Sequence, residues 1–172
     1  MALLPILTAP DARLKQRAQP VVAVDDAIRT LMDDMLATMY HASGVGLAAP
    51  QVGVLLRVIV MDVSYDQQQG NHHPIYLANP QISASEGDLS WKEGCLSIPD
   101  TTYEVNRRAQ ITVQGLGRHN EPVTLEATGL LAVCLQHEID HLDGILFIDH
   151  LSRLKRELTL KRLRKRKDDH RE

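Results

Sequence analysis

Aromatic residues are scarce in this sequence, which has one Trp, one Phe and four Tyr among 172 residues. A folded core must therefore consist mainly of aliphatic side chains. The chain also lacks a run of the roughly 18 apolar residues that a membrane span requires. Its start, Met1-Ala2-Leu3-Leu4-Pro5, lacks the basic-then-apolar layout of a secretory signal. We therefore expect a cytoplasmic protein that does not contact membranes.

Cysteine is also rare. Cys95 and Cys134 could form one disulfide, but a chain of this length without an export signal has little use for one. We expect both thiols to be reduced.

Charge is unevenly distributed along the chain. Residues 153–167 hold nine Lys or Arg and one acid, about +8, within a chain whose net charge is −3. The remainder is therefore acidic, at about −11. The negative net charge, and the absence of aromatic residues between the Lys and Arg residues of 153–167, argue against sequence-specific nucleic-acid binding. The basic run itself suits either a solvated helix face or contact with a phosphate-rich surface.

Three long helices are predicted. Asp25 is a good N-cap for a helix that ends near His41, and apolar residues recur on one face from Ile28 to Met39. A helix over 129–143 is apolar nearly all round, which is typical of a buried central helix, and Gly144 would end it. A basic helix over 152–167 has Leu154 and Leu158 as its expected docking face. Asp11 marks a shorter helical piece near the N-terminus.

Strands are expected where β-branched residues gather. The run 54–63 predicts a largely buried strand, and further strands are expected over 75–79, 103–107, 110–115 and 122–127. The last two would form a hairpin through residues 117–120. Residues 66–74 form a predicted polar, exposed loop.

The residues that most clearly indicate a catalytic or metal-binding site lie in the run His137-Glu138-Ile139-Asp140-His141. On a helix, two histidines four residues apart lie on one face, where both can bind one metal ion and Glu138 can reach a water on it. The alternative is a pair of structural, hydrogen-bonded histidines. Three ionisable groups on an otherwise apolar helix are costly to bury unless something compensates them, which favours the metal.

The third ligand decides the class of site, because hydrolytic metal sites usually keep three protein ligands. One zinc-peptidase pattern continues His-x-x-Gly-x-x-His, and this chain follows it to Gly144 but has Phe147 at the last position. Glu157 is the acid on the next helix, yet it lies among basic side chains. Cys95 is better placed, since a thiolate binds zinc or iron(II) strongly. For Cys134 we favour a buried, non-catalytic thiol.

Three segments together resemble the peptide deformylase family: Gly44-Val45-Gly46-Leu47-Ala48-Ala49-Pro50-Gln51, Glu93-Gly94-Cys95-Leu96-Ser97 and Gln136-His137-Glu138-Ile139-Asp140-His141. Their order and spacing match the family as far as about residue 150. The resemblance implies removal of the formyl group from the N-terminal formyl-methionine of new bacterial or organellar proteins. It also implies an α+β fold, with antiparallel or mixed sheets around the buried metal-binding helix. One divalent ion is expected, natively iron(II), with zinc, nickel or cobalt as substitutes.

The resemblance assigns roles to individual residues. It implies that Cys95, His137 and His141 bind the metal, that Glu138 is the general base, and that the Gln51 amide and the Leu96 backbone N–H stabilise the oxyanion. Backbone pairing with an extended peptide is implied for Val45, Gly46 and Gly94. The methionine side chain would enter a pocket made by Trp91, Leu130, Val133 and Cys134.

Residues 1–150 are accordingly the expected catalytic deformylase domain, with 151–172 a C-terminal basic helix belonging to the same domain. Some deformylases dock on the ribosome through a C-terminal helix, and this tail resembles one. Two rivals stay open at this point: a small zinc peptidase, and a ribosome-associated binding protein whose metal site does not catalyse hydrolysis.

Overall fold

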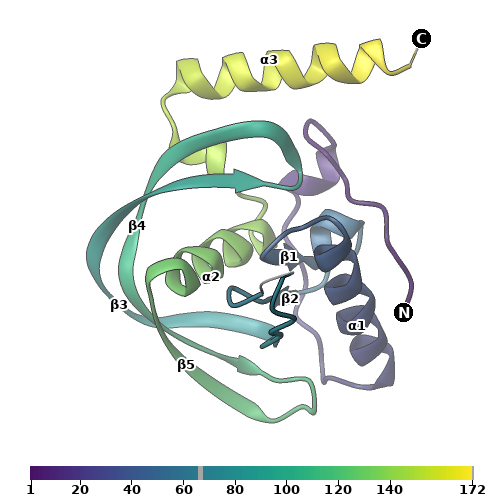
Figure 1. Cartoon of the computed structure of the whole chain (residues 1–172), viewed down its shortest axis with the longest axis vertical. Coiled ribbons are helices and arrows are strands. Elements are labelled where there is room, and N and C mark those ends of the chain that lie inside the picture. The colour runs from purple at the N-terminus through teal and green to yellow at the C-terminus, as the bar shows by residue number, and fades with distance from the viewer. Residues whose placement is uncertain (66–67, 172) are drawn as a thin grey trace.

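The computed structural model describes residues 1–65 and 68–171. Within them, three α-helices and five strands occur in the order α1 (Asp26–His41), β1 (Gly46–Ala48), β2 (Val58–Met61), β3 (Ile75–Cys95), β4 (Ile98–Leu116), β5 (Pro122–Thr128), α2 (Gly129–Leu142) and α3 (Arg153–Asp169). Short 3-10 helices lie at Ala12–Lys15, Ala49–Val52 and Phe147–His150. The strands pair antiparallel in chain order, which confirms the α+β expectation (Figure 1).

Strands β3 and β4 form a long ribbon that curves around α2 (Figure 1). Their pairing has register shifts after Ala78, Ile82 and Gly94, and such irregularities bend a ladder. The predicted strand 75–79 is much too short, and the predicted strands 103–107 and 110–115 are parts of one strand. Residues 81–88 are exposed and largely polar, so no apolar alternation marks them as a strand.

Strand β2 lies between two helices, which explains why all four of its residues are buried. Val58 and Val60 pack in the cluster that contains the α1 side chains, whereas Ile59 and Met61 pack in the cluster that contains the α2 side chains. Alternate residues of a strand face opposite sides, so each face of β2 covers a different helix. The sequence predicts this buried strand over 54–63, a longer span than it has.

The first two helices match their predicted ranges closely. The Asp25 side chain accepts a hydrogen bond from the Ile28 backbone N–H (3.0 Å) and starts α1. Gly144, with φ of 73°, follows α2. Asp11 caps the short 3-10 helix Ala12–Lys15 in the same way.

Helix α3 docks through a different face from the predicted one. Leu154 and Leu158 are 68% and 57% exposed, so their expected docking role is wrong. Thr159 and Leu163 are buried instead, the latter in a cluster with Leu14 and Phe147. Leucines occur on both sides of this basic helix, and spacing alone does not tell which side meets the core.

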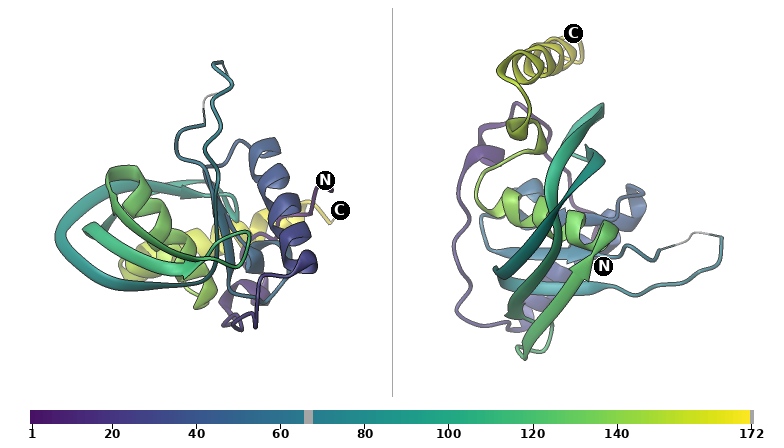
Figure 2. Two further views of the ribbon diagram at one scale, coloured as in Figure 1. Left: turned by 90° about the horizontal axis from the view of Figure 1, so that it is seen from below. Right: turned by 90° about the vertical axis from the view of Figure 1, so that its left-hand side faces the viewer.

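The two views in Figure 2 show residues 62–65 and 68–74, between β2 and β3, extending away from the sheet. Residues 68–73 are exposed, as predicted for this polar loop, while Asp66 and Gln67 lie outside the described residues. Within the described part of the chain, none of the helices has the length and apolar character needed to cross a bilayer.

Candidate metal centre

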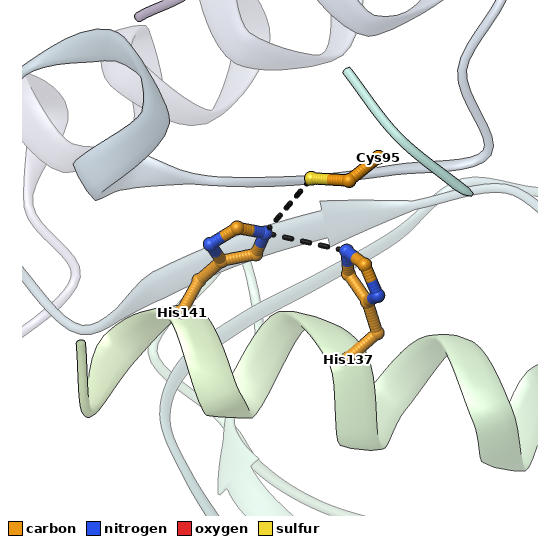
Figure 3. A group of neighbouring side chains, drawn as sticks. All are labelled: Cys95, His137 and His141. Atoms are coloured by element: carbon orange, nitrogen blue, oxygen red, sulfur yellow. Dashed lines mark hydrogen bonds between the residues drawn. The ribbon is translucent and has the colours of Figure 1, made fainter. Parts of the chain in front are cut away.

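Three potential metal ligands meet beside α2. His137 and His141 lie one turn apart, with 3.3 Å between their Nε2 atoms, and the Cys95 sulfur at the end of β3 lies 3.3 Å from Nε2 of His141 (Figure 3). All three ligand atoms lie within 4.8 Å of one another. Cys95 is 42 residues from His137 in sequence, so the curved β3–β4 ribbon brings it to the helix.

The arrangement fits a single cation. Nδ1 of His137 lies 2.9 Å from a carboxylate oxygen of Glu93, so Nδ1 carries the proton and Nε2 presents its lone pair toward His141 and Cys95. Metal–nitrogen bonds of about 2.0–2.1 Å and metal–sulfur bonds of about 2.3 Å put tetrahedral ligands roughly 3.3–3.6 Å apart. The two separations of 3.3 Å that involve Nε2 of His141 agree with this. His141 and Glu138 are buried.

His137 is held by a network of ion pairs that is buried at Glu93 and Arg107 and reaches the surface at Asp140 and His150. Arg107 donates to both Glu93 oxygens, from Nε (2.7 Å) and Nη2 (2.8 Å), and donates from Nη1 to Asp140 (2.6 Å). Nε2 of His150 lies 2.8 Å from the same Asp140 oxygen. The sequence reasoning assigned no role to Arg107 or to Glu93, although Glu93 lies in a segment that carries the resemblance. Glu93 and Cys95 are alternate residues of one strand and so share a face, which is the signal that could have found Glu93.

Burial dominates the electrostatics of the site. It raises the pKa of Glu138 to about 7, and one oxygen of that carboxylate has no hydrogen-bond partner among the described residues. Burial likewise raises the pKa of Cys134 and lowers that of His141. Burial also acts to raise the pKa of Glu93, but hydrogen bonds from Arg107 and His137 outweigh it and leave that pKa below its usual value.

A cavity of about 600 Å³ opens next to the ligand group. It is lined by every residue that the sequence analysis proposed for the site except His141: Val45, Gly46, Gln51, Trp91, Gly94, Cys95, Leu96, Leu130, Val133, Cys134, His137 and Glu138. His141 lies behind them in contact with Cys95 and His137. The lining also includes residues that the sequence reasoning did not propose, among them Ser43, Lys92, Asp100, Thr101 and Thr102.

The Gln51 amide is fixed at the back of this cavity. Its oxygen accepts from the Ala48 backbone N–H (2.9 Å), and its nitrogen donates to the Ser97 hydroxyl (3.0 Å) and lies 3.6 Å from the Cys95 sulfur. Ser97 is fully buried. Ser97 belongs to one of the segments that carry the family resemblance, but the sequence reasoning assigned it no role, because the partner of its hydroxyl is known only from the fold.

Gly46 leaves room for the catalytic candidate. A Cβ atom at this position would lie 2.7 Å from a Glu138 oxygen and 2.8 Å from the Cys134 sulfur. The absence of a side chain at Gly46 therefore lets Glu138 occupy its place beside the ligands.

The sequence profile of the family described as "Polypeptide deformylase" matches residues 3–157. The chain belongs to this family. Among its relatives, the peptide deformylase of Alkalilimnicola ehrlichii is 53% identical over 165 residues, covering 96% of this chain and 91% of that protein. The peptide deformylase of Thermodesulfovibrio yellowstonii is 50% identical, covering 97% and 100% respectively.

Solved deformylases have the same fold. The structure from Legionella pneumophila superposes with a TM-score of 0.89 at 46% identity, covering 98% of each chain. The structure from Ehrlichia chaffeensis superposes with a TM-score of 0.92 at 38% identity, covering 98% of this chain and 99% of that chain. The chain is a metal-dependent deformylase that removes the N-formyl group from nascent peptides, which confirms the expected family, fold and activity. The zinc-peptidase and non-catalytic alternatives are set aside.

Proposed function

We propose that Cys95, His137 and His141 hold the catalytic ion of this deformylase and that Glu138 transfers the proton. The contact of one sulfur and two imidazole nitrogens beside a buried carboxylate supports this assignment. A bound divalent ion supplies Lewis acidity, lowering the pKa of water and withdrawing electron density from a carbonyl. Thiolate and imidazole ligands suit iron(II), zinc, nickel and cobalt. Iron(II) as the native ion follows from the family resemblance.

Glu138 acts first as a base and then as an acid. Its carboxylate removes a proton from the attacking water while the water oxygen bonds to the formyl carbon. The same proton then passes to the methionine nitrogen as the carbon–nitrogen bond breaks. The products are a peptide with a free amine and formic acid, which keeps the second water proton and releases it to solvent as formate. One water is consumed and no other reactant is needed. The low exposure of Glu138, 4%, keeps competing solvent away from this proton.

Negative charge develops on the formyl oxygen during the attack, and two donors are proposed to stabilise it: the Gln51 amide N–H and the Leu96 backbone N–H. Both residues line the cavity next to Cys95. The hydrogen bonds of Gln51 to Ala48 and Ser97 hold its amide in place before the substrate arrives. Such preorganised donors are typically worth several kcal/mol in acyl transfer.

The peptide is proposed to lie extended along Val45, Gly46 and Gly94. Glycine permits the close backbone approach that such pairing needs. The methionine side chain enters the apolar part of the cavity, lined by Trp91, Leu130, Val133 and Cys134. A solved peptide deformylase from Acinetobacter baumannii, 33% identical with a TM-score of 0.81, is described as bound to Met-Ala-Ser. A peptide of that kind, beginning with methionine, is what deformylation would release here.

The exchange Glu138→Gln tests the proton transfer. It keeps the size of the side chain but removes the base, so turnover of formyl-Met-Ala-Ser should fall by about 10²–10⁴-fold while the metal per protein is unchanged. Glu126→Gln, at an exposed position on β5, is the matched control. Activity near that of the parent in Glu138→Gln would remove Glu138 from this role.

The exchange Cys95→Ser tests the ligand set. Because an alcohol is a much weaker ligand than a thiolate, metal per protein after desalting should fall. Full retention of the metal would point to a different third ligand.

We further propose that residues 1–150 form the catalytic domain, that residues 151–172 are part of it, and that α3 contacts the ribosome in the cytoplasm. Leu154, Leu158, Lys161 and Lys165 recur at the spacing of one helix face, and all four are exposed. Truncation after residue 150, or Lys161→Glu with Lys165→Glu, should abolish co-sedimentation with ribosomes at low salt. Unchanged co-sedimentation of the truncated protein would refute the contact.

A further inference from the structure

The start of β4 contains a bulge directly opposite the ligand Cys95. Gly94 pairs with Thr102 and Cys95 pairs with Ile98, so residues 99–101 have no partner on β3. Asp100 within the bulge has φ of 55°, a left-handed conformation that is uncommon for a residue other than glycine. Such a conformation persists only when its surroundings hold it.

Helix α3 supplies those surroundings. Nη1 of Arg162 lies 3.4 Å from the Asp100 carbonyl oxygen, and Nη2 of the same guanidinium donates to the Thr101 hydroxyl. Arg166 forms an ion pair with the Asp100 carboxylate. Two arginines one helical turn apart therefore bind both the backbone and the side chain of the bulge.

Tyr103, which follows the bulge on β4, makes further contacts with α3. The Thr159 hydroxyl lies 3.4 Å from the Tyr103 hydroxyl, and the Lys155 ammonium lies 5.8 Å from the centre of the Tyr103 ring. Thr159 is buried in this contact. The helix is thus anchored at Tyr103 and reaches the bulge with the two arginines.

The bulge lies at the mouth of the catalytic cavity. Asp100, Thr101 and Thr102 line the same cavity as Cys95 and Glu138. The Asp100 side chain is 77% exposed, whereas Glu138 is 4% exposed, so Asp100 lies at the open end of the cavity and Glu138 at its closed end. A peptide with its formyl group at Glu138 can therefore leave the cavity past Asp100 and its neighbours.

We infer that Arg162 and Arg166 are positioning residues for the substrate, because they fix the bulge that contacts the second peptide residue after methionine. This inference rests on the proposed binding of the formyl group beside Glu138. The two arginines touch no reacting atom. Ion pairs as exposed as that of Arg166 with Asp100 contribute little to overall stability, so their removal should alter peptide binding while destabilising the fold only slightly.

The test compares two substrates in the metal-loaded, full-length enzyme. For Arg162→Ala with Arg166→Ala, KM for formyl-Met-Ala-Ser should rise about two- to fivefold, the size of effect expected for such contacts. KM for formyl-Met-Ala, kcat for both peptides and metal per protein should stay at parental values. The thermal midpoint should fall by no more than about 2–4 °C. Arg164→Ala with Arg171→Ala removes the same charge from exposed positions near the same end of the chain and should match the parent.

A second variant distinguishes loss of the contact between Arg166 and Asp100 from a general disruption of α3. Asp100→Asn keeps a side chain that tolerates the left-handed backbone but removes the charge that Arg166 pairs with, so it should show the same selective rise in KM. An unchanged KM, or an equal rise for both peptides, would overturn the inference. Loss of metal or of kcat would overturn it too, because α3 would then support the reacting end of the site.

A separate variant tests the proposed methionine pocket itself. Leu130→Ala should raise KM for both peptides if methionine occupies the apolar pocket. Parental kinetics in Leu130→Ala would discredit the pocket, whatever the arginine variants show.

Discussion

Replacement of Arg107 by methionine would remove the cation at the centre of the ion-pair network behind His137. The side chains of Arg107 and Glu93 are each 4% exposed, and two hydrogen bonds of 2.7 and 2.8 Å join them. Methionine keeps an unbranched apolar stem but is shorter than arginine and has no donor. The Glu93 carboxylate would keep its contact with His137 but lose the guanidinium, which stays fully charged at neutral pH.

The expected loss of stability in Arg107→Met follows from the burial of the ion pair between Arg107 and Glu93. Breaking a buried ion pair by removing one partner typically costs about 3–5 kcal/mol, because the other charge stays buried without compensation. Arg107→Met should therefore lower the free energy of unfolding of the metal-free protein by about that amount. Because Glu93 also orients a metal ligand, metal affinity should fall by about 10- to 100-fold, as is typical when a partner of a metal-bound histidine is disturbed.

The neighbouring residue provides the control. Arg108 is also in an ion pair, with Asp88 at 2.9 Å, but its side chain is 46% exposed and that of Asp88 is 85% exposed. Arg108→Met should cost less than about 1 kcal/mol and leave metal affinity unchanged. Urea unfolding in the presence of a chelator measures the first quantity, and competition with a metal indicator measures the second.

A double variant separates the lost charge from lost packing. Glu93→Gln with Arg107→Met removes both charges, and the new side-chain amide oxygen can still accept a hydrogen bond from His137. This variant should recover part of the stability lost in Arg107→Met. Equal destabilisation by Arg107→Met and Arg108→Met, or no recovery in the double variant, would refute the burial argument.

Further outcomes follow from close contacts in the structure. Gly46→Ala should displace Glu138, which its new Cβ would meet at 2.7 Å, so kcat should fall by about 10²-fold while the metal is retained. Gly144→Ala, at φ of 73° and with Cβ 2.5 Å from the Lys15 carbonyl oxygen, should lower unfolding free energy by about 1–3 kcal/mol. Gly70→Ala shares the positive φ but meets nothing within 4 Å, so a loss as large as that of Gly144→Ala would contradict the clash argument. Chelating the metal should lower the urea midpoint of the parent, since an ion that binds only the folded state stabilises it; an unchanged midpoint would exclude that linkage.

Local patterns in the sequence were sufficient to predict the positions of the helices and to identify the family. Helical periodicity and caps set α1 and α2, because side chains three and four residues apart share a face whatever the rest of the fold does. The same geometry brings His137 and His141 together. The chemistry of the candidate third ligands favoured Cys95, the resemblance implied the same residue, and the structure brings its sulfur to the two imidazoles.

Only the tertiary structure decided the extent of β3, the docking face of α3 and the partners of the metal ligands. A strand such as β3, exposed over much of its length, has no apolar alternation, and its pairing with β4 depends on residues far along the chain. Leu154 and Leu158 have the spacing of a docking face, yet Thr159 and Leu163 meet the core. Glu93, Arg107 and the bulge at Asp100 act through long-range contacts, which a sequence pattern of a few residues does not encode.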